Sequence, residues 1–197
     1  MTLICLGDSL TYGFGIPRHR VWPSLLAKTT GMKVLNWGIN GDTTGGMLAR
    51  FQAHSAVSDA RAAILMGGFN DLALGADMGV VKANMFALVQ QCFSVRVKPV
   101  LGIPIPVRHP ITFPLLASMD VDRACAAYDG LRPWLLSLAE DFSLPVVDFY
   151  RRFEEFLVSA ALNGREYFDA LYTDGLHASE AGHALMAQEA ARALHNI

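Results

Sequence analysis

Short apolar runs alternate along the chain with longer segments in which apolar residues recur at helical spacing. Each run is rich in leucine, isoleucine, valine or methionine, which is typical of strands buried on both faces. We expect strands at Leu3–Leu6, Val34–Trp37, Ala62–Met66, Pro99–Ile103 and Leu144–Val147. The helical spacing and the residues that favour helix ends predict helices at Val21–Lys28, from Thr43 or Thr44 to Phe51, at Val80–Val95, from Asp120 or Asp122 to about Asp141, and from Ser179 or Glu180 to about Leu194.

This alternation predicts a parallel sheet, because parallel neighbours need crossover connections. Helices would cover both faces of the sheet, so the expected fold class is a three-layer α/β/α arrangement with about five parallel strands. The length of 197 residues suits one domain. We therefore expect residues 1–197 to form a single domain.

One predicted connection, Pro104–Met119, is unusually long. It carries four prolines among apolar side chains. A connection of this length inside a compact domain is more often functional than idle. It is a candidate substrate loop.

Four polar segments stand where the predicted strands end or where the last helix begins. They are Gly7–Leu10, Gly38–Asp42, Gly68–Asp71 and Asp174–His177. In open parallel sheets, ligands bind outside the carboxyl ends of the strands. All four segments are thus expected at one edge of the sheet.

Three of these residues have the chemistry of nucleophilic catalysis. A serine hydroxyl is a weak nucleophile and needs a base within hydrogen-bond reach, and His177 could serve Ser9 in this way. Asp174, three residues before the histidine, could hold the imidazole in the right tautomer. Taken alone, each residue is more simply explained as a turn, cap or surface residue, so the hypothesis depends on their combination.

Acyl transfer also needs hydrogen-bond donors for the developing oxyanion. The backbone N–H groups of Ser9 and Gly41 and the side-chain amide of Asn70 are the natural set. Gly41 would let a substrate approach the backbone closely, because glycine has no Cβ. Taken alone, both Gly41 and Asn70 could be ordinary turn residues.

The four segments together resemble the SGNH, or GDSL, hydrolase family along most of the chain. Gly7-Asp8-Ser9-Leu10 is similar to the family's nucleophile block and Asn40-Gly41-Asp42-Thr43 to its glycine block. Gly68-Phe69-Asn70-Asp71 resembles its asparagine block, and Asp174-Gly175-Leu176-His177 its Asp-x-x-His block. The short first block points to small esterases of the thioesterase I/lysophospholipase and arylesterase kind. The resemblance implies a flavodoxin-like sheet, metal-free hydrolysis of small acyl esters without a cofactor, and tolerance of several acyl substrates.

The substrate is less narrowly predicted than the reaction. Residues of the substrate loop and residues next to the blocks could line an acyl or aryl pocket, since such pockets are mostly apolar with a few polar anchors. The candidates are Asp8, Phe69, Met78, Ile105, Phe113 and Leu115. An equally good interpretation is that several of them pack the loop onto the core.

Two other functions stay open. A carbohydrate acetylesterase of the same family is one, although the three tryptophans are too dispersed to suggest a sugar platform. A non-enzymatic nucleotide-binding module, with Gly7–Thr11 as a phosphate cradle, is the other. The nucleotide-binding function is disfavoured because the sequence has neither a Gly-x-Gly-x-x-Gly motif nor a P-loop lysine.

Composition excludes several classes of protein. The chain is 52% apolar and 17% charged with a net charge of −2, which fits neither a disordered segment nor a nucleic-acid binder. Cys5, Cys92 and Cys125 have no metal-type spacing and are expected to be buried free thiols, so we expect no metal site. The chain shows no signal peptide and no apolar run long enough to span a membrane. We therefore expect a cytoplasmic protein without stable membrane insertion, unless a leader segment has been removed from the given sequence, and leave open whether it forms a homo-oligomer.

Overall fold

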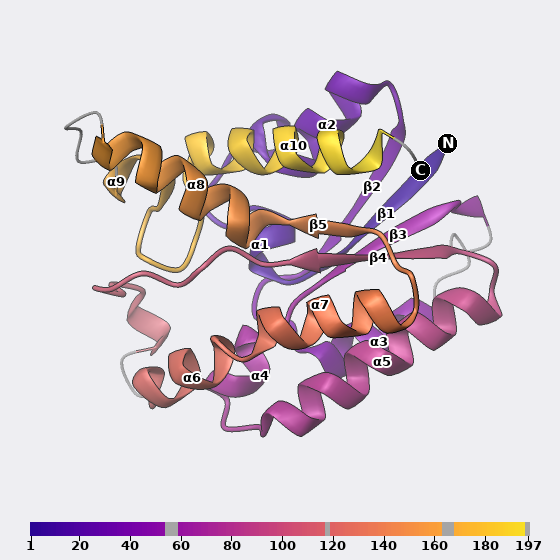
Figure 1. The fold of residues 1–197 in the computed structure, drawn as a ribbon, viewed down its shortest axis with the longest axis horizontal. Helices are drawn as coiled ribbons and strands as arrows, with labels where there is room; N and C mark the ends of the chain where they lie inside the picture. The colour runs from indigo at the N-terminus through magenta and orange to yellow at the C-terminus, as the bar shows by residue number, and fades with distance from the viewer. Residues whose placement is uncertain (54–58, 117–118, 163–167, 196–197) are drawn as a thin grey trace.

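In the computed structural model, the described residues are 1–53, 59–116, 119–162 and 168–195. They form a sheet of five parallel strands in the order β2-β1-β3-β4-β5 (Figure 1). The strands are β1 (Thr2–Gly7), β2 (Lys33–Gly38), β3 (Ala62–Met66), β4 (Lys98–Ile103) and β5 (Val146–Asp148). The predicted parallel α/β/α fold class is confirmed.

Helices cover both faces of this sheet. They are α1 (Ser9–Tyr12), α2 (Trp22–Thr30), α3 (Thr44–Ala53), α4 (Phe69–Ala73), α5 (Met78–Ser94), α6 (Val121–Tyr128), α7 (Leu131–Asp141), α8 (Phe149–Leu162), α9 (Phe168–Leu171) and α10 (Glu180–Leu194). Figure 1 shows α2, α8, α9 and α10 on one face, with α3 to α7 on the other.

The central strands are buried on both sides, which explains their continuous apolar runs. Leu3 and Cys5 of β1 belong to the core under α2, α8 and α10. Ile4 and Leu6 of the same strand belong to the core under α3, α5 and α7. Successive side chains of a strand point to opposite faces, so each face receives every second residue.

The single long helix predicted up to Asp141 is wrong, because the structure has two helices, α6 and α7, that meet at Asp129 and Gly130. Pro133 explains the break. It has no N–H to donate to the carbonyl of Asp129, and in a continuous helix its ring would clash with that carbonyl.

The fifth strand begins two residues later than predicted. Leu144 donates its N–H to Ala139 O at 2.8 Å and so closes the end of α7. Pro145 has no N–H to pair, although its carbonyl accepts from Leu101 at 3.0 Å.

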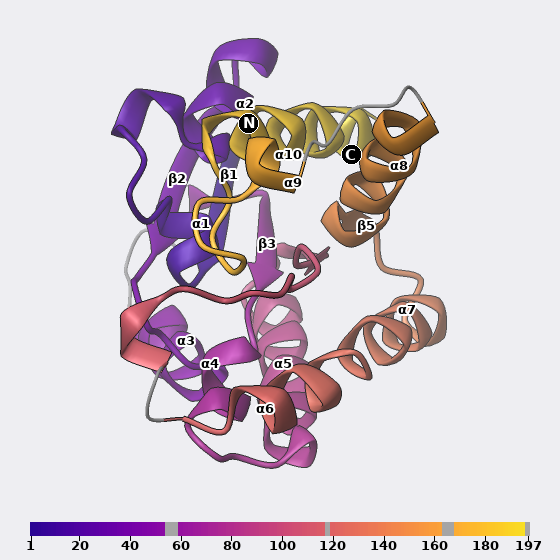
Figure 2. The ribbon, with the colours of Figure 1, turned by 90° about the vertical axis from the view of Figure 1, so that its left-hand side faces the viewer.

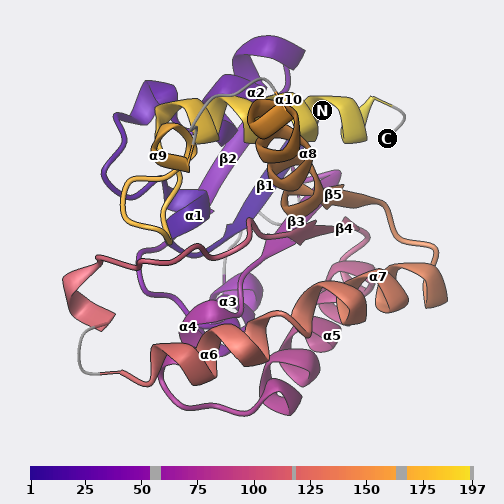
Figure 3. The same cartoon turned by 60° about the vertical axis from the view of Figure 1, so that its left-hand side comes forward.

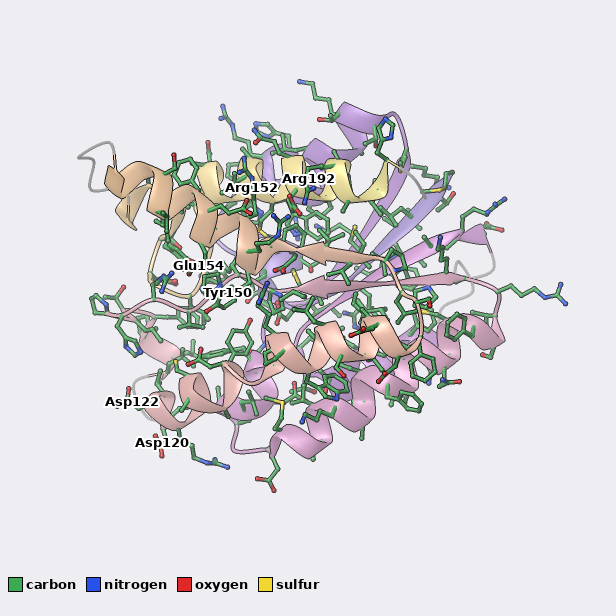
Figure 4. The ribbon with its side chains drawn as sticks, in the orientation of Figure 1. Asp120, Asp122, Tyr150, Arg152, Glu154 and Arg192 are labelled. Carbon is green, nitrogen blue, oxygen red and sulfur yellow. The ribbon has the colours of Figure 1, made fainter. Side chains whose placement is uncertain are left out.

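Helix α8 was not among the predicted elements. Phe149 and Phe153 point into the core, and Figure 4 shows Arg152 on the outer surface near Arg192 of α10. Glu154 binds Arg108 of the segment after β4 and so ties α8 to the candidate substrate loop.

Candidate active site

Ser9 follows the carboxyl end of β1 and is the first residue of the short helix α1. The carboxylate of Asp8 caps this helix by accepting from Leu10 N at 2.9 Å, and Gly13 ends it by donating to Ser9 O at 2.8 Å. The side chain of Ser9 is nearly buried, with the residue 9% exposed. Figure 2 looks onto this edge of the sheet, where α1, α4 and the segment before α10 gather.

The segment before α10 brings a histidine and an aspartate to the same edge. Asp174 Oδ1 accepts from the backbone N–H of His177 at 2.7 Å and from that of Leu176 at 3.0 Å. Asp174 Oδ2 lies 2.7 Å from His177 Nδ1. Burial raises the pKa of Asp174, but the side-chain and backbone hydrogen bonds from His177 outweigh it and hold this pKa below its usual value. The carboxylate is thus ionised and acts as an acceptor.

The imidazole reaches the serine on its other side. Because the ionised carboxylate can only accept, Nδ1 carries the proton and Nε2 is left as an acceptor. Nε2 lies 3.0 Å from Ser9 Oγ, which is hydrogen-bond distance for the serine hydroxyl. The structure therefore brings the three predicted residues into one hydrogen-bonded series.

The predicted oxyanion donors flank this series from the neighbouring strands. Gly41 follows β2 and has a φ of +75° at the third position of a turn closed by Asp42 N–H on Ile39 O at 3.2 Å, a conformation that suits glycine. Asn70 follows β3 and donates one N–H of its amide to Asp42 O at 2.8 Å. Both residues line the same cavity as Ser9 and His177.

That cavity has a volume of about 310 Å³ and a mostly apolar wall. The lining residues are Ser9, Phe14, Asn40, Gly41, Asn70, Ala73, Leu74, Phe113, Leu115, Leu116, Met119, Leu176 and His177. The rings of Phe14 and Phe113 lie 4.7 and 4.9 Å from the imidazole of His177, centroid to centroid. An apolar group of a ligand would therefore sit directly against the reactive atoms.

The candidate substrate loop crosses this edge of the sheet (Figure 3). Arg108 N–H donates to Gly175 O at 2.8 Å, and Thr112 N–H donates to Asp174 O at 2.9 Å. These bonds fix the loop to the segment that carries Asp174 and His177. Phe113 and Leu115, two of the predicted substrate-binding residues, consequently line the cavity, and Leu115 is 70% exposed at its surface.

The other four predicted substrate-binding residues lie outside the cavity wall. Asp8 is 3% exposed and caps α1, and Ile105, two residues after the end of β4, is buried in the core under α8 and α10. Phe69 is buried with its ring 5.3 Å from that of Tyr128, and Met78 packs against the same core at the start of α5. These four residues therefore contribute to the core or to a helix end in the structure and do not line the cavity.

Several lining residues were not predicted. Phe14 has no motif of its own, and only the fold brings it to Ser9, whereas Met119 is the last residue of the candidate substrate loop. Asn40 and Leu176 lie inside two of the polar segments, so their positions in the sequence were a usable signal.

The part of the chain that the structure describes contains no group of three His, Cys, Asp or Glu side chains able to hold a metal ion. The thiols of Cys5, Cys92 and Cys125 are all free, and burial raises the pKa of Cys92 to about 12. Cys5 and Cys92 are buried as predicted, whereas the prediction is wrong for Cys125, which is only partly buried on α6. Within the same residues, no helix is both long and apolar enough to cross a membrane.

A serine, an imidazole and a carboxylate in hydrogen-bonded series have the geometry of a serine hydrolase, placed here on a three-layer α/β/α fold. The model of the GDSL-like lipase/acylhydrolase family matches residues 5–185. The chain belongs to this family.

Individual relatives agree with this assignment. An arylesterase from Vibrio mimicus is 33% identical over 92 residues, which cover 44% of this chain and 46% of the relative. Thioesterase 1/protease 1/lysophospholipase L1 from Escherichia coli is 27% identical over 154 residues, covering 76% of this chain and 66% of the relative. The matches thus span between about half and two thirds of these curated relatives. The crystal structure of a lipolytic G-D-S-L family member from Veillonella parvula is 25% identical, covers 100% of both chains and has a TM-score of 0.81.

Proposed function

We propose that this chain hydrolyses carboxylic esters with an apolar acyl or aryl group, through an acyl-enzyme on Ser9. The observation that carries the proposal is the series Ser9 Oγ, His177 Nε2, His177 Nδ1 and Asp174 Oδ2, with distances of 3.0 and 2.7 Å, opening onto an apolar cavity. Membership of an acylhydrolase family supports it.

In the first half of the reaction, Ser9 Oγ attacks the ester carbonyl and His177 Nε2 takes its proton. The resulting oxyanion is stabilised by the N–H groups of Ser9 and Gly41 and the amide of Asn70. Collapse of this intermediate expels the alkoxide, which takes the proton from Nε2 and leaves as the alcohol. Asp174 stabilises the imidazolium in between.

In the second half, water replaces the alcohol. Nε2 takes a proton from water as it attacks the acyl-enzyme, and returns that proton to Ser9 Oγ when the carboxylic acid leaves. The same three donors bind the second oxyanion. The enzyme is thus regenerated without a cofactor.

The cavity wall supports the choice of substrate class. Its polar side chains are those of Ser9, Asn40, Asn70 and His177, and the remaining side chains are apolar. A carbohydrate ester would instead need several donors and acceptors around the sugar. The names of the relatives, arylesterase and thioesterase/lysophospholipase, point to aryl, thio- and longer acyl esters as the ones to test.

The test is a panel of p-nitrophenyl esters and acyl-CoA thioesters of graded chain length, combined with a mutant cycle. We expect Ser9→Ala and His177→Ala each to lower kcat by about 10⁴–10⁶, and the double variant to lose little more, because the two residues share one proton transfer. Exposed residues provide the matched controls Ser94→Ala and His19→Ala, which should retain full activity.

Two outcomes would contradict the proposal. Additive losses in the cycle would mean that Ser9 and His177 act separately. A chain that hydrolyses no member of the panel but binds a nucleotide would favour the non-enzymatic alternative.

A further inference from the structure

Arg50 of α3 holds two acceptors at the end of the sheet where the nucleophile lies. Its Nε donates to Asp42 Oδ2 at 2.7 Å, and its Nη2 donates to Gly7 O at 2.9 Å. The side chains of Arg50 and Asp42 are only 22% and 11% exposed, so water competes weakly for these bonds. A planar guanidinium can hold two acceptors in a fixed relation, which a lysine cannot. Arg50 thus joins the residue two positions before Ser9 to the residue next to Gly41.

The turn that carries Gly41 is fastened at both ends by this arrangement. At its start, Ile39 N–H donates to the same carbonyl of Gly7 at 3.1 Å. At its end, Arg50 holds the side chain of Asp42. Gly41 therefore cannot shift relative to the end of β1 unless one of these bonds breaks.

The third oxyanion donor is attached to the same frame. Asn70 Nδ2 donates to the backbone carbonyl of Asp42 at 2.8 Å. An amide carries two N–H groups, so this bond orients Asn70 and leaves its second N–H for an oxyanion.

We propose that Arg50 is the positioning residue of the oxyanion site. Through Gly7 and Asp42 it keeps the N–H groups of Ser9 and Gly41 and the amide of Asn70 in one rigid frame. This inference rests on the proposed function, because it concerns the donors of that reaction.

The role differs from that of a catalytic residue or a substrate ligand. Arg50 does not belong to the lining of the cavity, so it acts only through other residues. Donors stabilise a transition state best when they need not reorganise, and a misplacement of about 1 Å can cost about 10² in rate. Loss of Arg50 is thus expected to lower kcat, while KM changes little because the apolar wall is intact.

Gly46 offers an independent way to break the same link. A Cβ on Gly46 would lie 2.0 Å from Asp42 Oδ1, so alanine there displaces the carboxylate while Arg50 is still present. On Gly45, a Cβ would meet nothing closer than Asn84 Nδ2 at 3.6 Å. Both glycines lie in the first turn of α3, where alanine is the better helix former. Gly45→Ala is therefore the matched control for Gly46→Ala.

The experiment compares Arg50→Gln and Gly46→Ala with Arg132→Gln and Gly45→Ala. Arg132 is a suitable control because it forms a similar pair, with Asp148 at 2.7 Å, away from the cavity. Thermal melting establishes that each variant is folded. The readouts are kcat and KM for a p-nitrophenyl ester and the inhibition constant of a trifluoromethyl ketone. Ser9 Oγ adds to the carbonyl carbon of this ketone, His177 takes the serine proton, and the carbonyl oxygen becomes an oxyanion.

We expect both test variants to lose about 10- to 100-fold in kcat, with KM changed less than about threefold. The inhibition constant of the ketone should rise by a similar factor, because the ketone mimics the intermediate. Both controls should stay within about twofold of the unmodified chain.

Test variants that are folded and match their controls would overturn the inference, and so would a rise in KM alone. If Arg50→Gln does not fold, the inference is tested by Gly46→Ala alone, with the same measurements of kcat, KM and the inhibition constant. An unmodified chain that hydrolyses no ester would reject the proposed function together with this inference. Ester hydrolysis that depends on Ser9 but not on Arg50 would reject the inference alone.

Discussion

Asp8, the residue before Ser9, is a buried carboxyl group with close acidic neighbours. Burial raises its pKa from 3.8 to about 7, and the charges of Asp42 and Asp71 add to this, while the N–H of Leu10 opposes it. In the unfolded chain the pKa of Asp8 returns to about 3.9. Because the folded value is the higher one, the folded state binds this proton more tightly.

The stability of the protein should therefore depend on pH in a defined window. The contribution of Asp8 is fully present below about pH 4 and is lost as the pH rises through about 7. Asparagine keeps the acceptor for Leu10 and carries no charge. We expect Asp8→Asn to raise the melting temperature at pH 8.5 relative to the unmodified chain, and to have a much smaller effect at pH 4.

Asp120→Asn provides the control, because Asp120 caps α6 in the same way from an exposed position (Figure 4). A difference in melting temperature between Asp8→Asn and the unmodified chain that is equal at both pH values would contradict the argument.

At this scale the sequence predicts which polar side chains meet at the edge of the sheet better than which residues line the cavity. Ser9, Asp174 and His177 stand at strand or helix ends, where topology alone brings them together. Ile105 and Phe113 belong to the same loop, yet only Phe113 reaches the cavity, because the bonds from Arg108 and Thr112 decide how the loop folds back. Such bonds leave no periodic signal in the sequence.

Helix α10 is closely packed at its beginning. Ser179 caps it by accepting from Gly182 N at 3.2 Å, and Gly182 lies against the end of α9. A Cβ on Gly182 would come within 2.5 Å of the backbone carbonyl of Leu171, which cannot rotate away. Helix α10 also follows His177 closely, so its position matters for the site.

Gly182→Ala should consequently destabilise the protein by about 1–3 kcal/mol, the usual cost of overpacking. Gly79 of α5 is the matched control, since a Cβ there would meet nothing within 4 Å. We expect Gly79→Ala to be neutral or stabilising by up to about 1 kcal/mol. Urea unfolding of both variants checks this, and equal free energies of unfolding would refute it.

Helix α8 was missed in the sequence although its apolar residues have helical spacing. Phe149, Phe153, Phe156 and Leu157 have helical spacing, and Asp148 accepts from Arg151 N at 2.9 Å as a cap would. The helical spacing was present, but the charged residues between the apolar ones made the segment look like an exposed connection. The break at Gly130 was likewise readable from Pro133.

For the whole molecule, the strand order decides which segments meet. Since β1 lies between β2 and β3, the segments with Gly41 and Asn70 flank Ser9 on its two sides. The alternation of strands and helices predicted that these segments share one edge of a parallel sheet, but it predicted neither the strand order nor the volume and shape of the cavity.

The proposed reaction also leads to a prediction about the metal dependence of ester hydrolysis. Ester hydrolysis should be unchanged after dialysis against EDTA, because the reaction proposed above uses protein groups only. The measurement is kcat/KM before and after dialysis. A loss that zinc restores would show that a metal takes part.

The hydrogen bond between Ser9 and His177 joins residues that are 168 positions apart. On a translating ribosome, the proposed nucleophile and all three proposed oxyanion donors emerge long before His177, the proposed base. A nascent chain would thus contain the serine without its activity, and hydrolysis would begin only when α10 docks beside α2. The time at which esterase activity appears during synthesis would then report directly when folding is complete.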